Sequence, residues 1–168
     1  MLPDIWQNVQ RVLVIQLGDV KDIVLTAPAL LTLSQTLPNA AVTLMVLPTL
    51  RQMALQLPSV EQIWVYEGTD FTSLNTKPQL NLVEQLSRSA FDAAIILTNM
   101  GESPYPLAYI CYLAGIPIRI GQSQEFGGSV LSQWVKLKAD TSVNRHLGLL
   151  ESAGFPIAGG LPCDHYAS

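Results

Sequence analysis

The stretch RVLVIQLGDVKDIVLTAPAL, residues 11–30, decides the fold of this 168-residue chain. Val12–Leu17 is almost wholly apolar and rich in β-branched residues, a pattern typical of a strand buried on both faces of a parallel sheet. A glycine ends this run, and apolar residues at helical spacing extend over Asp22–Thr36. Asp19 and Asp22 therefore fall at the carboxyl end of a strand, where open α/β sheets bind their ligands.

Apolar strand-like runs alternate with helical patterns along the rest of the chain. This alternation predicts a three-layer α/β/α, Rossmann-like domain with a mainly parallel sheet over residues 1–157. The expected strands are Val12–Leu17, Val42–Leu47, Gln62–Tyr66, Ala93–Thr98 and Ile118–Ile120, and the expected helices are Asp22–Thr36, Leu50–Gln56, Leu80–Ser89, Pro106–Leu113 and Val143–Ala153.

The connections carry turn signals. Gly154 stands directly after the last expected helix, in the position that favours glycine, and the polar residues 69–79 are expected to form a surface loop. Gln124–Trp134 contains two glycines. It is either a mobile loop over a ligand or a connection whose aromatic residues, Phe126 and Trp134, enter the core, and the second interpretation is favoured.

Composition narrows the class of protein. Hydrophobic residues make up 49% of the chain and charged residues 13%, which fits a sheet covered on both faces or a surface hidden by another domain. Nine basic and 13 acidic residues, with no basic stripe, do not indicate a nucleic-acid partner. No run approaches the roughly 20 apolar residues that span a bilayer, and the first residues lack a secretory-signal pattern. A cytoplasmic location is therefore expected.

Metal-ligating residues are sparse. Cys111 and Cys163 have no metal-ligand spacing, and the two histidines are His146 and His165. We therefore expect no metal site.

The opening stretch resembles that of glycosyltransferase family 9, the family that includes the ADP-heptose:lipopolysaccharide heptosyltransferases. Its usual pattern is Leu-Gly, two variable residues, Gly-Asp-Val and an apolar stretch leading to Thr-x-Pro-Ala-Leu. Thr26, Pro28, Ala29 and Leu30 match the end of this pattern. Ungapped alignment on these residues places the family's catalytic aspartate at Asp22.

Two positions depart from the family pattern. Lys21 stands where the family has a glycine, and Gln16 stands where it often has a basic residue. Later segments also resemble the family: Leu113–Gly121 follows its Leu-Ala-Gly-x-x-x-Arg-Ile-Gly segment, and Asn144–Gly154 follows the helix that closes its first domain. The resemblance covers about residues 10–157.

The resemblance implies the N-terminal half of a two-domain GT-B glycosyltransferase that works without a metal or other cofactor. Such an enzyme transfers a sugar, here heptose from ADP-heptose, to a lipopolysaccharide-like glycolipid or other saccharide acceptor, near a membrane surface. The N-terminal half would hold the acceptor. Residues 158–168 have the composition of an interdomain linker, and the second domain, which binds the nucleotide-sugar, is absent from this sequence. We expect the 168 residues alone to be inactive.

Asp22 is the candidate catalytic residue. An inverting glycosyl transfer needs one carboxylate that takes the proton of the acceptor hydroxyl as the new bond forms. A structural role fits the same position, because an aspartate there can cap the helix or interact with its dipole in the first turn. The sequence leaves both interpretations open.

The candidate acceptor-binding residues are Gly18, Asp19, Lys21, Ser103 and Arg119. Gly18 would let the loop turn or a ligand approach closely, and Asp19 and Lys21 follow it on the same loop. Ser103 lies on the loop after a later strand, and Arg119 could bind a carboxylate or phosphate. Turn formation or exposure to solvent also explains each of them.

A function of another class remains open. The chain could be a non-catalytic flavodoxin-like or Rossmann-like module that binds a small anion or nucleotide, or packs on a partner protein, because such sheets host many functions. Lys21 and Gln16 favour this alternative, since they replace residues of the family pattern. His146, on the last expected helix, is expected at the surface.

Overall fold

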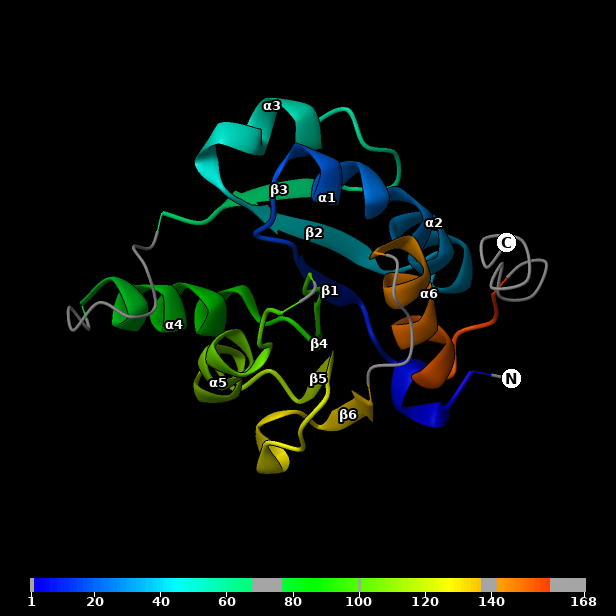
Figure 1. The fold of residues 1–168 in the computed structure, drawn as a ribbon. Helices are drawn as coiled ribbons and strands as arrows, with labels where there is room; N and C mark the ends of the chain where they lie inside the picture. Colours follow the sequence, from blue (N-terminus) through cyan, green and yellow to red (C-terminus); the bar gives the residue numbers. More distant parts are fainter. Residues whose placement is uncertain (1, 68–76, 100, 137–141, 158–168) are drawn as a thin grey trace.

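The computed structural model describes residues 2–67, 77–99, 101–136 and 142–157 (Figure 1). Within these residues, six strands form one sheet in the order β3-β2-β1-β4-β5-β6, and every neighbouring pair is parallel. The strands are β1 (Arg11–Ile15), β2 (Ala41–Val46), β3 (Gln62–Val65), β4 (Ala93–Ile96), β5 (Ile118–Ser123) and β6 (Gln133–Lys136). The α/β class and the parallel sheet expected from the sequence are confirmed.

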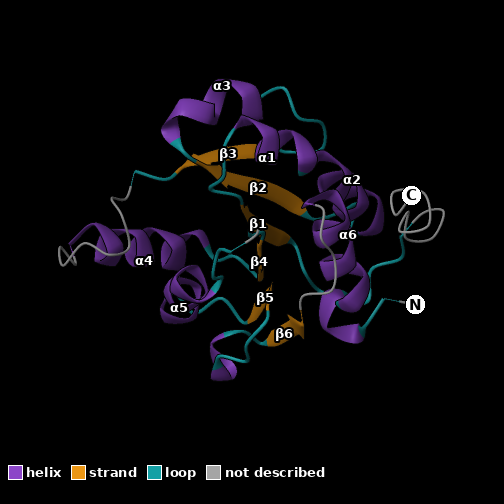
Figure 2. Cartoon of the chain, in the orientation of Figure 1, coloured by secondary structure: helices purple, strands orange, loops and turns teal. Residues whose placement is uncertain are grey.

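Helices cover both faces of the sheet (Figure 2). On one face lie α1 (Val20–Leu25), α2 (Ala27–Thr36), α3 (Arg51–Ala54) and α6 (Ser142–Ser152), and on the other lie α4 (Lys77–Ser89) and α5 (Tyr105–Leu113). Short 3-10 turns occur at Asp4–Trp6, Pro48–Leu50 and Gly128–Val130. The layers are those expected from the alternation of strands and helices.

Strand β1 is apolar because it is buried on both faces of the sheet. Val12 and Val14 pack under α1, α2 and α6, whereas Leu13 and Ile15 pack under α4 and α5. All four side chains are buried because β1 lies between β2 and β4 in the middle of the sheet.

The sheet also determines where a ligand can bind. After β1 the chain proceeds to β2 on one side, and after β4 it proceeds to β5 on the other. The loops that leave these two neighbouring strands therefore diverge. Open parallel sheets bind ligands at this switch in strand order, outside the carboxyl ends of the strands.

The first helix differs from its expected form. Instead of one helix over Asp22–Thr36, the structure has α1 and α2, which meet at Thr26. Pro28 lies in the first turn of α2 and has no backbone N–H to continue the hydrogen bonds of α1. The helix pattern in the sequence is real, but the proline divides it.

The segment before the last helix also differs. Gln133–Lys136 forms the edge strand β6, which the sequence analysis did not assign. The expectation that Phe126 enters the core is wrong, because this side chain is 67% exposed and packs edge-on against Trp134, with ring centroids 5.5 Å apart. A short strand at a sheet edge lacks the apolar run that identifies a buried one.

Three predictions about connecting segments have different outcomes. Lys77–Gln79 belongs to α4 rather than to a loop, and the rest of the expected loop, residues 69–76, lies outside the described residues. The expected linker, residues 158–168, also lies outside them. Gly154 has a φ of 102° directly after α6, so the prediction of glycine in this position is confirmed.

Candidate functional site

A cavity of about 770 Å³ opens beyond the carboxyl ends of β1 and β4, which lie side by side. Its apolar walls come from Leu17, Val20, Leu47 and Leu50, and its polar side chains include Asp19, Asp22, Asn99 and Glu102. Small-molecule sites are typically hollows of roughly 300–1,000 Å³ with a few polar groups on apolar walls. This cavity has the size and composition of a site for a small ligand.

A capping box places Asp22 at the cavity. Asp19 is the N-cap of α1, and its Oδ1 accepts a hydrogen bond from the Asp22 N–H at 3.2 Å. In return, Asp22 Oδ2 accepts the Asp19 N–H at 2.9 Å. The cap proposed for Asp22 is therefore supplied by Asp19, and Asp22 is the reciprocal carboxylate in the first turn.

Asn99 holds the same oxygen from the neighbouring loop. Its Nδ2 donates to Asp22 Oδ2 at 2.7 Å, and its backbone N–H donates to Glu102 Oε2 at 3.0 Å. Both hydrogen bonds that the described residues give the Asp22 carboxylate fall on Oδ2. Oδ1 accepts no hydrogen bond within the described part of the chain.

The environment of Asp22 favours proton uptake. Burial raises the pKa of its carboxyl above the ordinary value of 3.8, and the Asp19 carboxylate raises it further, against the lowering effect of the Asp19 N–H and the Asn99 amide. A carboxylate whose pKa is raised in this way is a better base than an exposed one.

Gly18 leaves room for this arrangement. A Cβ at Gly18 would collide with Asp22 Oδ2 and would lie 2.6 Å from Asn99 Nδ2. A side chain at this position would therefore displace the Asp22–Asn99 pair. Gly18 also lines the cavity, as expected for a residue that lets a ligand approach the backbone.

Known structures share this architecture. A family 9 glycosyl transferase from Veillonella parvula matches 88% of this chain and 42% of its own length, with a TM-score of 0.68 and 19% identity. The chain has the fold of part of a family 9 glycosyltransferase. The E. coli heptosyltransferase WaaC with ADP matches with a TM-score of 0.67 and 16% identity, over 89% of this chain and 49% of WaaC. WaaC with ADP-2-deoxy-2-fluoro heptose matches with a TM-score of 0.65 and 16% identity, over 89% of this chain and 50% of WaaC.

The similarity of this chain to these glycosyltransferases is a similarity of fold. This chain spans half or less of the length of these glycosyltransferases. No family model matches its sequence, and no curated protein does. None of the described helices is long and apolar enough to cross a membrane.

The structure brings together only some of the predicted site residues. Gly18, Asp19 and Asp22 line the cavity. Lys21 is exposed and is not part of its lining, and Ser103 instead accepts the Tyr105 N–H at 3.2 Å at the start of α5. Lys21 and Ser103 stay predictions as acceptor-binding residues.

The Arg119 side chain binds backbone carbonyls of neighbouring connections. Its Nε donates to the Val130 carbonyl and its Nη1 to the Ile116 carbonyl, both at 2.6 Å. The guanidinium also lies over the ring of Tyr112, 5.2 Å from its centroid. These contacts hold the connections on either side of β5, and Arg119 does not line the cavity with Asp22.

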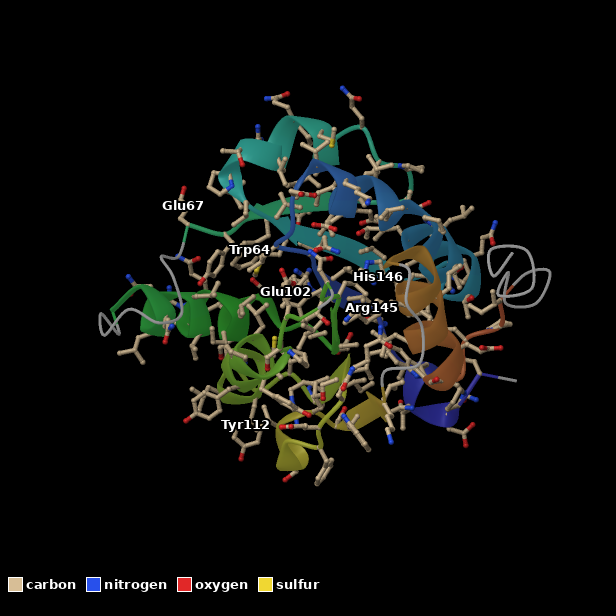
Figure 3. The ribbon with its side chains drawn as sticks, in the orientation of Figure 1. Trp64, Glu67, Glu102, Tyr112, Arg145 and His146 are labelled. Carbon is tan, nitrogen blue, oxygen red and sulfur yellow. The ribbon has the colours of Figure 1, made fainter. Side chains whose placement is uncertain are left out.

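The structure contradicts the predicted surface position of His146. It was expected at the surface but is 1% exposed, on the side of α6 that faces the sheet. Burial, together with a smaller effect of the adjacent Arg145 charge, lowers the pKa of its imidazole to about 4. Figure 3 labels both residues, and the charge of Glu102, also labelled there, raises the pKa of Arg145 against the lowering effect of burial. A polar residue inside a helix pattern does not by itself show which face it occupies.

Asn99 is the site residue that the sequence analysis missed. It follows β4, and the parallel pairing of β4 with β1 brings it next to Asp22, 77 positions away in sequence. The available signal was its place directly after a buried strand, on the loop that also holds Ser103. Among the described residues, no three His, Cys, Asp or Glu side chains are grouped to hold a metal ion.

Proposed function

We propose that this chain is the N-terminal, acceptor-binding half of an inverting glycosyltransferase, with Asp22 as its catalytic base. The observation that carries the proposal is the Asp22 carboxylate, held through Oδ2 at a cavity where the strand order of the sheet switches. The shared fold with glycosyltransferases supports this class of reaction.

The chemistry needs one proton acceptor and one leaving group. Asp22 Oδ1 would accept the proton of an acceptor hydroxyl while the hydroxyl oxygen attacks the anomeric carbon of the donor sugar. The bond between that carbon and the nucleoside diphosphate breaks on the opposite face, and the diphosphate leaves with the electron pair. Asp22 becomes a neutral acid, which its partly buried setting favours.

The donor we propose is a nucleotide-sugar, ADP-heptose. Structures of WaaC with ADP and with a fluorinated ADP-heptose support this choice. A second domain beyond residue 157 would bind the donor, and this chain would hold a lipopolysaccharide-like or other saccharide acceptor, in the cytoplasm and near the membrane. No metal or other cofactor is part of the proposal.

The test is Asp22→Asn in the protein that contains both domains. The carboxamide oxygen can accept from the Asp19 N–H and Asn99 Nδ2 as Asp22 Oδ2 does, so we expect the fold to be kept. The amide cannot take a proton, so transfer of heptose from ADP-heptose should fall by at least ~100-fold. Release of ADP in the presence of acceptor measures the rate.

Asp92→Asn is the matched control. Asp92 Oδ2 also accepts two hydrogen bonds, from the N–H groups of Gln10 at 2.8 Å and Arg11 at 3.0 Å, but it lies at the amino ends of β1 and β4, away from the cavity at their carboxyl ends. Its variant should transfer at the wild-type rate. Equal rates for wild type and Asp22→Asn would reject the proposed base and favour the non-catalytic module, in which Asp22 only completes the capping box.

The 168-residue chain should not catalyse transfer by itself. It would hold the acceptor and the base but not the donor, whose binding we assign to the second domain. A transfer rate from the 168 residues comparable to that of the longer protein would contradict the assignment of donor binding to the second domain.

A further inference from the structure

Gln16 is a fully buried polar side chain directly after β1. Its Oε1 accepts the Gly18 N–H at 3.0 Å. Its Nε2 lies 3.3 Å from Thr26 Oγ1 and 3.4 Å from His146 Nε2. One carboxamide therefore contacts the loop after β1, the junction of α1 with α2, and helix α6.

The donors and acceptors in this cluster are fixed by their partners. The Gly18 N–H can only donate, so the oxygen of the carboxamide must face it and the NH₂ must face Thr26 and His146. Thr26 Oγ1 donates to the Asp22 carbonyl at 2.8 Å, so it accepts from Gln16. If Gln16 Nε2 donates across the 3.4 Å contact, His146 Nε2 accepts, and the imidazole carries its proton on Nδ1, a buried nitrogen with no hydrogen-bond partner among the described residues.

This cluster holds both ends of the segment that carries Asp22. At its start, Gln16 holds the N–H of Gly18, next to the Asp19 N–H that binds Asp22 Oδ2. At its end, Gln16 holds Thr26, whose hydroxyl binds the carbonyl of Asp22 itself. Movement of the Gln16 carboxamide would therefore shift the backbone on both sides of the Asp22 carboxylate.

We propose that Gln16 is a positioning residue for Asp22, because its carboxamide ties the loop and helix that carry Asp22 to His146 on α6. An effect of Gln16 on catalysis rests on the proposed function of Asp22. The positioning of the segment that carries Asp22 is argued from the hydrogen bonds alone.

Glutamine is suited to this position because one terminal group supplies an acceptor and two donors. A lysine has no acceptor for the Gly18 N–H, and a leucine has neither donor nor acceptor. A glutamate accepts the Gly18 N–H but cannot donate to Thr26 or to a neutral His146. A buried N–H or hydroxyl left without its partner destabilises the local arrangement.

The first test compares Gln16→Leu with Gln122→Leu in the 168-residue chain. Gln122 is also a buried glutamine in contact with α6, since its Nε2 donates to the Arg145 carbonyl at 2.9 Å, but it makes no hydrogen bond to Gly18 or Thr26. In Gln16→Leu, amide hydrogen exchange at Gly18 and Asp19 should accelerate by at least ~10-fold relative to the Gln122 variant.

The titration of Asp22 is a second readout from the same pair of variants. Burial is the main cause of its raised pKa, so a loosened segment should lower the pKa of Asp22 toward 3.8 in Gln16→Leu. Gln122→Leu should leave it unchanged. Carboxyl carbon NMR over a pH series measures the difference.

Gln16→Glu keeps the shape of the side chain and keeps the inference falsifiable if Gln16→Leu does not fold. A carboxylate beside His146 Nε2 favours a protonated ring, so the pKa of His146 should rise above about 4. Imidazole nitrogen NMR should show the Nδ1–H tautomer in the wild type. A wild-type Nε2–H tautomer would overturn the inference.

These readouts need neither donor nor acceptor, so their failure is distinguishable from failure of the proposed function. If exchange at Gly18 and Asp19 and the Asp22 titration respond alike to Gln16→Leu and Gln122→Leu, Gln16 is not a positioning residue, even where Asp22→Asn abolishes transfer.

Discussion

At the scale of single residues, Asp22 combines a structural and a proposed chemical role on its two oxygens. Oδ2 accepts from the Asp19 N–H and from Asn99, whereas Oδ1 accepts no hydrogen bond from the described residues, and Asp22 lines the cavity. The alternatives that the sequence left open for Asp22, a capping carboxylate or a base, are therefore compatible. Substitution by asparagine separates them, because it preserves an acceptor for the Oδ2 partners and removes the base.

Gly18→Ala should damage the site. A methyl group there would collide with Asp22 Oδ2 and approach Asn99 Nδ2 to 2.6 Å, so the Asp22 and Asn99 side chains must shift. We expect transfer by the two-domain protein to fall by at least ~10-fold, since misplaced catalytic groups are costly.

Gly148→Ala is the control for this substitution. Gly148 lies within α6, and a Cβ there would meet no heavy atom within 4 Å apart from its chain neighbours and the backbone of its own helix. The variant should retain its transfer rate and unfold at the same or a higher temperature, because alanine favours helix. Equal losses of rate in the two variants would show that Gly18 has no special relation to Asp22.

The sequence predicted part of the site. Gly18, Asp19 and Asp22 were found because they follow a recognisable strand, and their position depends on local chain geometry. Asn99 was missed because its proximity to Asp22 depends on the pairing of β4 with β1. Arg119 shows the limit for long side chains, since the direction of its guanidinium depends on backbone carbonyls that only the folded chain brings together.

At the scale of elements, the capping box of α1 is the feature that holds Asp22 at the cavity. Asp19→Ala removes the side chain that accepts the Asp22 N–H, and should lower the free energy of unfolding by ~1 kcal/mol. Asp19→Ser retains a capping oxygen and should recover most of that loss. Urea denaturation of the three proteins checks this ranking, and equal stability of all three would contradict the cap.

The elements that the sequence predicted are those with strong local patterns. Strands β1, β2 and β4 are buried on both faces and therefore read as apolar runs. The edge strand β6 was missed because half-exposed residues give no such run. The division between α1 and α2 required weighing Pro28 against a continuous apolar pattern.

At the scale of the whole molecule, the buried His146 links stability to pH. Its pKa is lowered from 6.5 to about 4 in the folded chain, so the unfolded chain takes up a proton at a higher pH. Stability should be full above about pH 6.5 and should fall as the pH decreases toward 4, by ~3 kcal/mol from this group.

His146→Gln isolates this contribution, since glutamine does not titrate and offers an acceptor to Gln16. The difference in unfolding free energy between pH 7 and pH 4.5 should be smaller in the variant than in the wild type. The same loss of stability in both proteins would show that His146 is not responsible.

The N-terminal segment completes the packing of the whole molecule. Trp6 is fully buried against Phe155, with ring centroids 4.7 Å apart, so the first turn packs on the end of α6. No periodic pattern predicts this contact, because a single aromatic residue in a short turn becomes part of the core only through the folding of the other end of the domain.

The measurement that tests the proposed base most directly is the pH dependence of kcat/KM for the two-domain protein, in the wild type and in Asn99→Ala. The Asn99 amide lowers the pKa of Asp22, so its removal should raise that pKa and move the acidic limb of the profile to higher pH. The limb should move by the same amount as the Asp22 carboxyl titration seen by NMR. A limb that stays in place while the Asp22 titration moves would contradict the assignment of Asp22 as the base.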